Sequence, residues 1–281
     1  MILAAGLATR LRPLTNELPK ALLPVANRPL IHYTLLLLKR YGITDIVINL
    51  HHHGKKIADA LGDGATLGVR IRYSWEPTIL GTGGGIKQAR QFLTGGTFLV
   101  INGDILIDLN LDKIVEGHHR RKAAVSMVVR ADPDAATYGA IELDGHDRIR
   151  RMLGRGSQTA TPLRQFMFTG VHLLEPSVIE AIPGSGFSSI TDVYISMLLR
   201  DEKLFGYVMK GTWMDLGTPE RYREADRLLG AGQLKLGYLK PAVVAQEPAL
   251  QPARQTAPRT PSATRPAKAS GKSSRVSRTG R

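Results

Sequence analysis

The N-terminal part of the chain alternates between strand-like segments and segments in which apolar side chains recur at helix spacing. Apolar runs and period-two alternation predict strands at residues 2–5, 45–50, 69–75 and 97–101. Helices are predicted between them at residues 29–41, 54–61 and 84–92. This order is typical of an α/β fold, in which helices cover both faces of a mainly parallel sheet. We therefore predict a doubly wound, Rossmann-like sheet.

The following part of the chain is richer in strand patterns. Strands are predicted at residues 123–130, 138–143, 164–174 and 204–209. Helices are predicted at residues 176–182, 189–200 and 219–229. We therefore predict a folded domain of residues 1–230, with a first half of about residues 1–122 and a small β-rich extension of residues 123–230.

The net charge of +14 is concentrated at the C-terminal end. From residue 231 onward there are ten Lys or Arg and one acid, Glu247, which is a net charge of +9 and leaves +5 for residues 1–230. Residues 241–281 are rich in Pro, Ala, Ser, Thr and Arg, so we predict a disordered basic tail there. The tail has no aromatic side chain for base stacking. We expect it to bind polyanions weakly and no nucleic acid specifically.

The composition excludes several classes of protein. The chain has no cysteine, which excludes disulfides, thiolate catalysis and cysteine-ligated zinc. Its apolar runs are far shorter than the roughly 20 residues that a membrane-spanning helix needs, and its N-terminus lacks the pattern of a signal peptide. We therefore expect a cytoplasmic protein without a membrane partner.

The loop after the first predicted strand combines small and basic residues. In such sheets, ligands bind at the carboxyl ends of the strands. Ala4, Ala5 and Gly6 let the backbone approach a ligand closely, and consecutive N–H groups can hold phosphate oxygens. Arg10 and Lys20 add cations that suit phosphate. An ordinary surface turn is the alternative interpretation, and the spacing is not that of a P-loop.

Three later segments carry further candidates. Residues 81–84 have almost no side chains, so a base or ribose could lie directly on them; a flexible hinge is the alternative. Asp104 follows a predicted strand and is a natural Mg²⁺ ligand, although Asn-Gly-Asp is also a common turn. Asp215 is flanked by apolar residues, so it is either a turn residue or a second metal ligand.

Together these segments resemble the motifs of the sugar-1-phosphate nucleotidyltransferases. The resemblance rests on the first loop with Lys20, on Leu-Gly-Thr-Gly-Gly at 80–84, on Asn-Gly-Asp at 102–104 and on Trp-Met-Asp-Leu-Gly-Thr-Pro at 213–219. It covers about residues 1–229. It implies an enzyme that transfers a nucleoside monophosphate from a nucleoside triphosphate (NTP) to a sugar 1-phosphate and releases pyrophosphate, with Mg²⁺ as cofactor.

The resemblance also assigns roles to residues. The catalytic residues would be Arg10, Lys20 and Asp104, and Asp104 and Asp215 would share the metal ion. The nucleotide would be held by the first half, through Ala4, Ala5, Gly6, Thr9, Arg10, Lys20, Gly81, Thr82, Gly83, Gly84 and Asn102. The sugar would be held by the second half, through Gly139, Arg155, Thr169 and Gly170.

The chain departs from the family pattern at several positions. Ala8 stands where the family usually has glycine, which narrows the approach to the triphosphate. Gly154 and Arg155 stand where many relatives carry Glu-Lys, and Phe168 replaces an asparagine before Thr169. These changes leave the identity of the sugar open. GTP with mannose or a related hexose 1-phosphate is the leading interpretation. The alternatives are N-acetylmuramate-1-phosphate uridylyltransferase and glucose-1-phosphate uridylyl- or thymidylyltransferase.

Two other functions fit parts of the sequence. A glycosyltransferase on a similar sheet would need Asp-x-Asp at the end of the third strand, where this chain has Asn102-Gly103-Asp104. A non-catalytic binder of anionic polymers would act through the tail. Deletion of residues 241–281 would abolish polymer binding and leave nucleotidyl transfer intact. A homodimer is an open alternative to a monomer.

Overall fold

The computed structural model describes residues 1–133, 135–137, 139–157 and 162–239. These residues form one compact unit. The predicted tail, residues 241–281, and Tyr138 lie outside the described residues. Within the described ranges, every helix is too short or too polar to span a bilayer.

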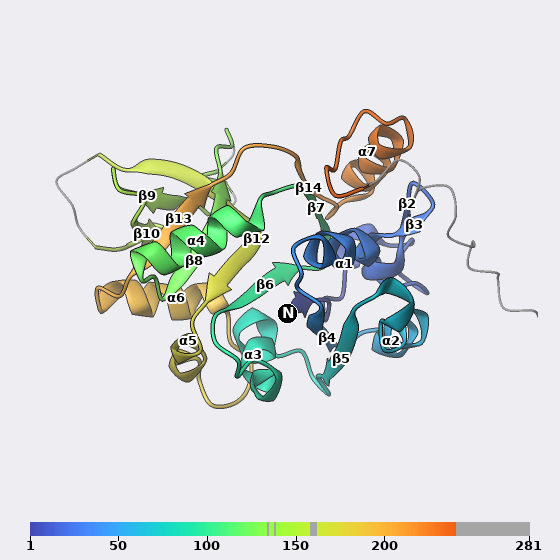
Figure 1. Cartoon of the computed structure of the whole chain (residues 1–281), viewed down its shortest axis with the longest axis horizontal. Coiled ribbons are helices and arrows are strands. Elements are labelled where there is room, and N and C mark those ends of the chain that lie inside the picture. The colour runs from blue at the N-terminus through green and yellow to red at the C-terminus, as the bar shows by residue number, and fades with distance from the viewer. Residues whose placement is uncertain (134, 138, 158–161, 240–281) are drawn as a thin grey trace, which may run out of the picture. The chain divides into compact units, whose positions relative to one another are not determined.

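The first half is built on four parallel strands in the order β6-β1-β4-β5 (Figure 1). They are β1 (Ile2–Leu3), β4 (Asp45–Leu50), β5 (Arg70–Trp75) and β6 (Phe98–Asn102). The helices between them are α1 (Leu30–Arg40), α2 (Gly54–Leu61) and α3 (Gly81–Gln88). These bounds agree closely with the sequence patterns except at α3. This helix begins at Gly81 rather than Gly84, so its glycines form the first turn instead of a loop before it.

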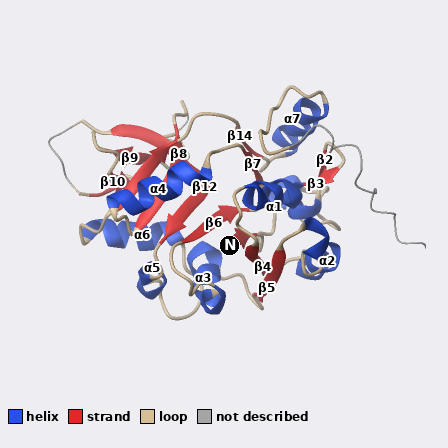
Figure 2. Cartoon of the chain, in the orientation of Figure 1, coloured by secondary structure: helices blue, strands red, loops and turns tan. Residues whose placement is uncertain are grey.

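The second half is joined to the first through β12 (Arg164–Leu174). One end of β12 pairs antiparallel with β6, so a single sheet runs through both halves (Figure 2). Along its length, β12 also pairs antiparallel with β8 (Val125–Arg130) and β9 (Ile141–Leu143). The remaining strands of this half are β10 (Ile149–Met152), β11 (Arg155–Gly156) and β13 (Leu204–Val208). The predicted β-rich extension is therefore a mixed continuation of the parallel sheet.

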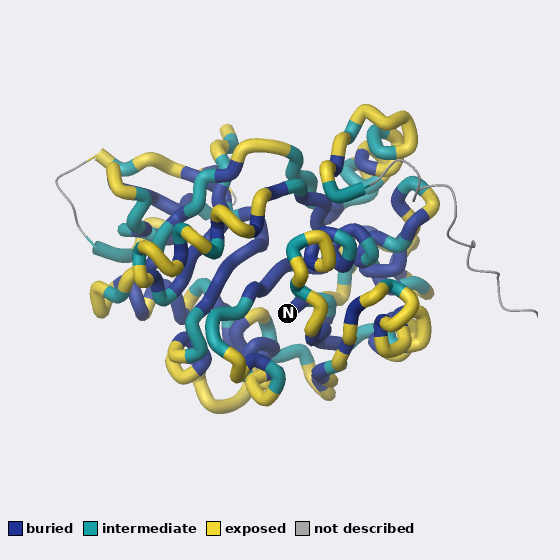
Figure 3. Tube along the Cα trace, in the orientation of Figure 1, coloured by how far each residue is buried: buried dark blue, intermediate teal, exposed yellow. Residues whose placement is uncertain are grey.

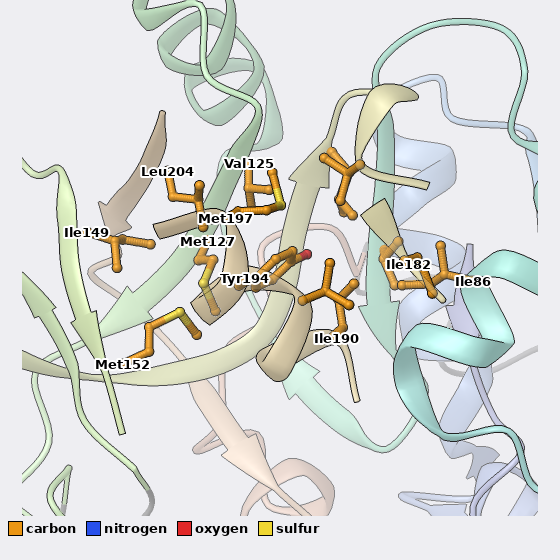
Figure 4. Packing of buried hydrophobic residues seen from close by; sticks show 14 of the residues in the cluster. Ile86, Val125, Met127, Ile149, Met152, Ile182, Ile190, Tyr194, Met197 and Leu204 are labelled. Atoms are coloured by element: carbon orange, nitrogen blue, oxygen red, sulfur yellow. The ribbon is translucent and has the colours of Figure 1, made fainter. Parts of the chain in front are cut away.

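Alternate residues of the central strands point to two separate cores, which is the reason that their sequences are apolar without interruption. Ile46 and Ile48 of β4 face one core, which α1, α2 and α4 (Leu111–Arg121) cover. Val47 faces the other core, under α3, α5 (Ser177–Ala181) and α6 (Ile190–Leu199). Figure 3 shows the buried strands at the centre, and Figure 4 shows Tyr194 of α6 within the second core.

A third, smaller core lies under α7 (Pro219–Gly230). It rests on β14 (Trp213–Asp215), which pairs antiparallel with β7 (Ile105–Ile107), and on the hairpin of β2 (Pro24–Val25) and β3 (Arg28–Pro29). The chain then packs back on the body, because Leu236 is buried and the Gly237 N–H donates to Asp108 Oδ2 at 2.7 Å. The folded body therefore extends beyond the predicted boundary at residue 230.

Candidate active site

The loop after β1 is fixed in place at both ends. The Ala4 N–H donates to Asn49 Oδ1 at 2.8 Å, and the Thr15 hydroxyl donates to the Ala8 carbonyl at 2.9 Å. Between these contacts the chain turns at Ala8, whose φ of 48° lies in the left-handed region, and enters a short 3-10 helix at Thr9–Leu11. A left-handed turn favours glycine, which is the residue that the family pattern has at this position.

This loop forms one wall of a cavity of about 460 Å³ at the carboxyl ends of the parallel strands. The catalytic and metal candidate Asp104 lines it, as do most of the residues proposed to bind nucleotide: Ala4, Ala5, Gly6, Thr9, Arg10, Lys20, Gly81, Thr82 and Asn102. The volume is within the usual range for a small-molecule site. The cavity therefore brings the loops after β1 and β6 and the first turn of α3 to one place.

A cluster of opposite charges lies at one side of this cavity. The Lys20 ammonium is 2.8 Å from Asp104 Oδ2 and 3.8 Å from Asp215 Oδ1. Asp215 reaches Lys20 because β14 pairs with β7, which places Asp215 opposite Ile105. The Lys20 side chain is only 10% exposed. The charge of its ammonium is therefore balanced by the two carboxylates, with little contact to water.

Two arginines complete the charged cluster around Asp215. Arg221 Nη1 donates to Asp215 Oδ2 at 3.0 Å. Arg10 reaches the same place, because a Cβ added to Gly217 would lie 3.1 Å from Arg10 Nη2 and 2.8 Å from Asp215 Oδ2. Arg10, Lys20, Asp104 and Asp215, which lie far apart in the sequence, therefore meet at one site. Because Gly217 has no side chain, it leaves room for the side chains of Arg10 and Asp215.

The start of α3 has a different role at each of its glycines. Gly81 and Thr82 line the cavity, but Gly83 and Gly84 do not. The N–H groups of Gly83 and Gly84 donate to the Ser188 carbonyl at 2.8 and 3.2 Å. A Cβ at Gly84 would lie 2.7 Å from the Gly186 carbonyl oxygen. Gly83 and Gly84 thus leave room for the segment before α6, which packs against them. From the sequence we expected these two glycines to contact the nucleotide.

Two further cavity residues were missed from the sequence. Glu76 follows β5 and is buried, and it accepts from Asn49 Nδ2 at 2.7 Å and from the Leu80 N–H at 3.0 Å. Asn49 ends β4 and also holds Ala4. Both lie at carboxyl ends of neighbouring parallel strands, and that position is the signal that could have identified them.

Comparison with known proteins agrees with this geometry. Residues 1–231 match the family model described as nucleotidyl transferase. The chain belongs to the nucleotidyl transferase family. It is 37% identical to N-acetylmuramate alpha-1-phosphate uridylyltransferase of Neisseria meningitidis over 82% of this chain and 98% of that protein.

Two other nucleotidyltransferases show how widely the family resemblance extends. Mannose-1-phosphate guanylyltransferase of Mycobacterium tuberculosis is 32% identical over 79% of this chain, which spans only 62% of that longer protein. A crystal structure of a putative glucose-1-phosphate thymidylyltransferase from Bacillus anthracis, in complex with a sucrose, has a TM-score of 0.72 and 26% identity. It covers 84% of this chain and 96% of its own length. The fold and the nucleotidyltransferase class are therefore shared.

In this nucleotidyltransferase, the four candidate sugar residues lie outside the lining of the cavity. Gly170 is the nearest to it, because a Cβ there would lie 2.6 Å from Nδ2 of Asn102, which does line the cavity. The Thr169 hydroxyl donates to the Val128 carbonyl at 2.8 Å, and the Thr169 carbonyl accepts from Trp213 Nε1 at 2.9 Å. Thr169 therefore holds the sheet together and is not brought to the cavity.

The other two candidate sugar residues lie on the β9–β11 side of the second half. Gly139 has a φ of 89° and is covered by the side chain of Leu153. Arg155 is exposed, and its Nη1 lies 3.5 Å from Asp192 Oδ1 on the first turn of α6. Neither lies in the nucleotide cavity, so a sugar contact by either requires the sugar to extend toward the second half.

Proposed function

We propose that this chain transfers a nucleoside monophosphate from an NTP to a sugar 1-phosphate and releases pyrophosphate, and that it does so in the cytoplasm. The observation that carries the proposal is the position of Lys20, which lies between Asp104 and Asp215 in the cavity that the loop after β1 lines. This arrangement suits a triphosphate, which needs cations and fixed dipoles around its oxygens. The relatives named above support the choice of a sugar 1-phosphate as acceptor.

The proposed reaction needs alignment and charge neutralisation more than acid–base catalysis. An oxygen of the sugar phosphate is already anionic, so it can attack the α-phosphorus of the NTP without a general base. A new P–O bond forms there as the bond between the α-phosphorus and the bridging oxygen breaks, and pyrophosphate leaves. Arg10 and Lys20 would neutralise the charge on the phosphates, while the backbone from Ala4 to Gly6 would hold the nucleotide.

We propose that Asp104 and Asp215 hold Mg²⁺ together with the phosphates. The donor set fits, because Mg²⁺ is usually bound by one or two carboxylates plus substrate phosphates and water. Such a site needs no cage of three or more acidic or histidine side chains, and none occurs among the described residues. When bound, the ion would neutralise the transferring phosphates. Lys20, which pairs with both carboxylates, would be free to turn toward a phosphate oxygen.

The first substrates to test are UTP and N-acetylmuramate 1-phosphate. The Neisseria meningitidis relative supports this pair, because it is 37% identical and matches over 98% of its own length. GTP with mannose 1-phosphate is the second candidate. It is supported by the Leu80–Gly81 pair, which resembles the guanylyltransferases, and by the Mycobacterium tuberculosis relative.

The test is a panel of the four NTPs with N-acetylmuramate, mannose and glucose 1-phosphates, monitored for release of pyrophosphate. We expect one pair to give pyrophosphate and nucleotide sugar in equal amounts, and only when Mg²⁺ is present. The same activity should survive deletion of residues 241–281. Absence of pyrophosphate from every pair would overturn the proposal. Transfer from a nucleotide sugar without pyrophosphate would favour a glycosyltransferase, and polymer binding alone would favour a role of the tail.

A further inference from the structure

An exposed phenylalanine lies at the rim of the cavity. Phe187 is 72% exposed, yet its ring contacts the backbone of Gly81, because a Cβ added to Gly81 would lie 2.9 Å from Phe187 Cε2. Gly81 itself lines the cavity. A large apolar side chain is therefore presented to solvent at the edge of the space in which the substrates would meet.

The segment that carries Phe187 is firmly held. The Ser188 N–H donates to the Leu80 carbonyl at 2.8 Å, and its carbonyl accepts from Gly83 as described above. Two residues further on, the Ile190 N–H donates to the Thr82 hydroxyl oxygen at 3.0 Å. These bonds hold the backbone of the segment against the first turn of α3, so the Phe187 side chain starts from a fixed point at the rim.

A second exposed apolar side chain lies over Gly139, one of the candidate sugar residues. Leu153 is 52% exposed, and its side chain occupies the space above Gly139 that a Cβ would need. Leu153 stands at the turn between β10 and β11, where it has a left-handed φ of 51°. The ion pair of Arg155 with Asp192 ties this turn to the start of α6, directly after the segment with Phe187. The two apolar side chains thus belong to neighbouring parts of the second half.

We infer that Phe187 and Leu153 select a sugar 1-phosphate whose ring carries acyl or ether substituents over one that carries hydroxyl groups alone. The inference rests on the proposed function and names the class of its acceptor. Methyl and methylene groups gain free energy when they are covered by apolar side chains, whereas hydroxyl groups would lose their hydrogen bonds to water there.

The test compares the full-length wild-type chain with Phe187→Ala and Leu153→Ala, using the NTP that the wild type accepts. The acceptors are N-acetylmuramate 1-phosphate, which carries both an acyl and an ether substituent, and glucose 1-phosphate, which carries neither. We expect each variant to lose about tenfold in kcat/KM for the substituted sugar, mainly through its KM. The KM for the NTP and the kcat/KM for glucose 1-phosphate should change by less than about twofold.

Two controls separate this role from a general effect. Phe187→Leu keeps an apolar side chain and should retain most of the selectivity. Leu199→Ala removes an apolar side chain at the far end of α6, whose exposure lies between those of Leu153 and Phe187, and should change nothing. Equal losses with both sugars, a raised KM for the NTP, or a wild type that prefers glucose 1-phosphate would overturn the inference while leaving the proposed function intact. A wild type without pyrophosphate release on any pair would overturn both.

Discussion

The Lys20 ammonium lies 2.8 Å from the Asp104 carboxylate, inside a cavity whose other wall is the loop after β1. Asp215 approaches the same ammonium from β14 at 3.8 Å. An ammonium that is mostly shielded from water and faces two carboxylates offsets their negative charge, and Arg221 adds a second cation at Asp215. The same three groups provide both signs of charge that a metal-bound triphosphate requires.

Replacement of either partner should therefore reduce turnover far more than stability. We expect Asp104→Asn and Lys20→Met each to lower kcat by at least about 100-fold, because each removes a charge aimed at the reacting phosphates. Pyrophosphate release at rising Mg²⁺ concentrations measures the effect, and excess Mg²⁺ should not restore Asp104→Asn. The exposed pair Lys55 and Asp59 is the matched control, and Lys55→Met and Asp59→Asn should leave kcat unchanged. Normal turnover in Lys20→Met would remove Lys20 from the site.

Glu76 should affect nucleotide binding and stability together. Both of its carboxylate oxygens accept hydrogen bonds at the wall of the cavity, one from Asn49 and one from Leu80. Glu76→Ala leaves these two donors unpaired, so we expect the KM for the NTP to rise about tenfold and the melting temperature to fall. Glu76→Gln keeps one acceptor and should be intermediate in both measurements. An unchanged KM and melting temperature in Glu76→Ala would show that the hydrogen bonds of Glu76 with Asn49 and Leu80 do not shape the cavity.

The longer strands of the central sheet and most helices could be predicted from the sequence, because apolar periodicity is a local signal. Residue type gave the charged candidates of the site, but the short strands β2, β3, β7, β10, β11 and β14 were not predicted. The packing role of Gly83 and Gly84 could not be predicted, because it depends on Ser188. This residue is distant in sequence and packs on them only in the fold. Asn49 and Glu76 are ordinary polar residues, and only their positions at adjacent strand ends distinguish them. The sugar side was the least predictable, since the side chains that contact Gly81 and Gly139 come from separate turns.

Two glycines within helices should respond to alanine in opposite directions. In α3, a Cβ at Gly84 would lie 2.7 Å from the Gly186 carbonyl oxygen, so Gly84→Ala must displace the segment that Ser188 anchors. We expect it to cost about 1–3 kcal/mol of unfolding free energy, which is typical of overpacking. In α4, a Cβ at Gly117 would meet nothing within 4 Å, so Gly117→Ala should stabilise by about 0.5–1 kcal/mol through helix propensity. Urea unfolding measures both, and stabilisation by Gly84→Ala would contradict the packing described above.

His172 should make the fold sensitive to mild acid. It is buried in β12 and shares a hydrogen bond of 2.6 Å with the Tyr194 hydroxyl. Burial, with a smaller effect of the N-terminal ammonium, lowers the pKa of His172 from 6.5 to about 3. Between these values the unfolded chain binds one more proton than the folded chain at this residue, so its contribution to stability is complete above pH 6.5 and is lost as the pH falls toward 3.

The change in stability is large enough to measure by urea unfolding at two pH values. From pH 7.5 to pH 5, proton uptake by His172 in the unfolded chain should remove about 2 kcal/mol of unfolding free energy. His172→Asn keeps a polar partner for Tyr194 and does not titrate, so its stability should fall by about 2 kcal/mol less than that of the wild type over the same range. His146→Asn replaces an exposed histidine and should follow the wild type. If His172→Asn also followed the wild type, His172 would have to take up its proton in the folded state, which its burial beside Tyr194 opposes.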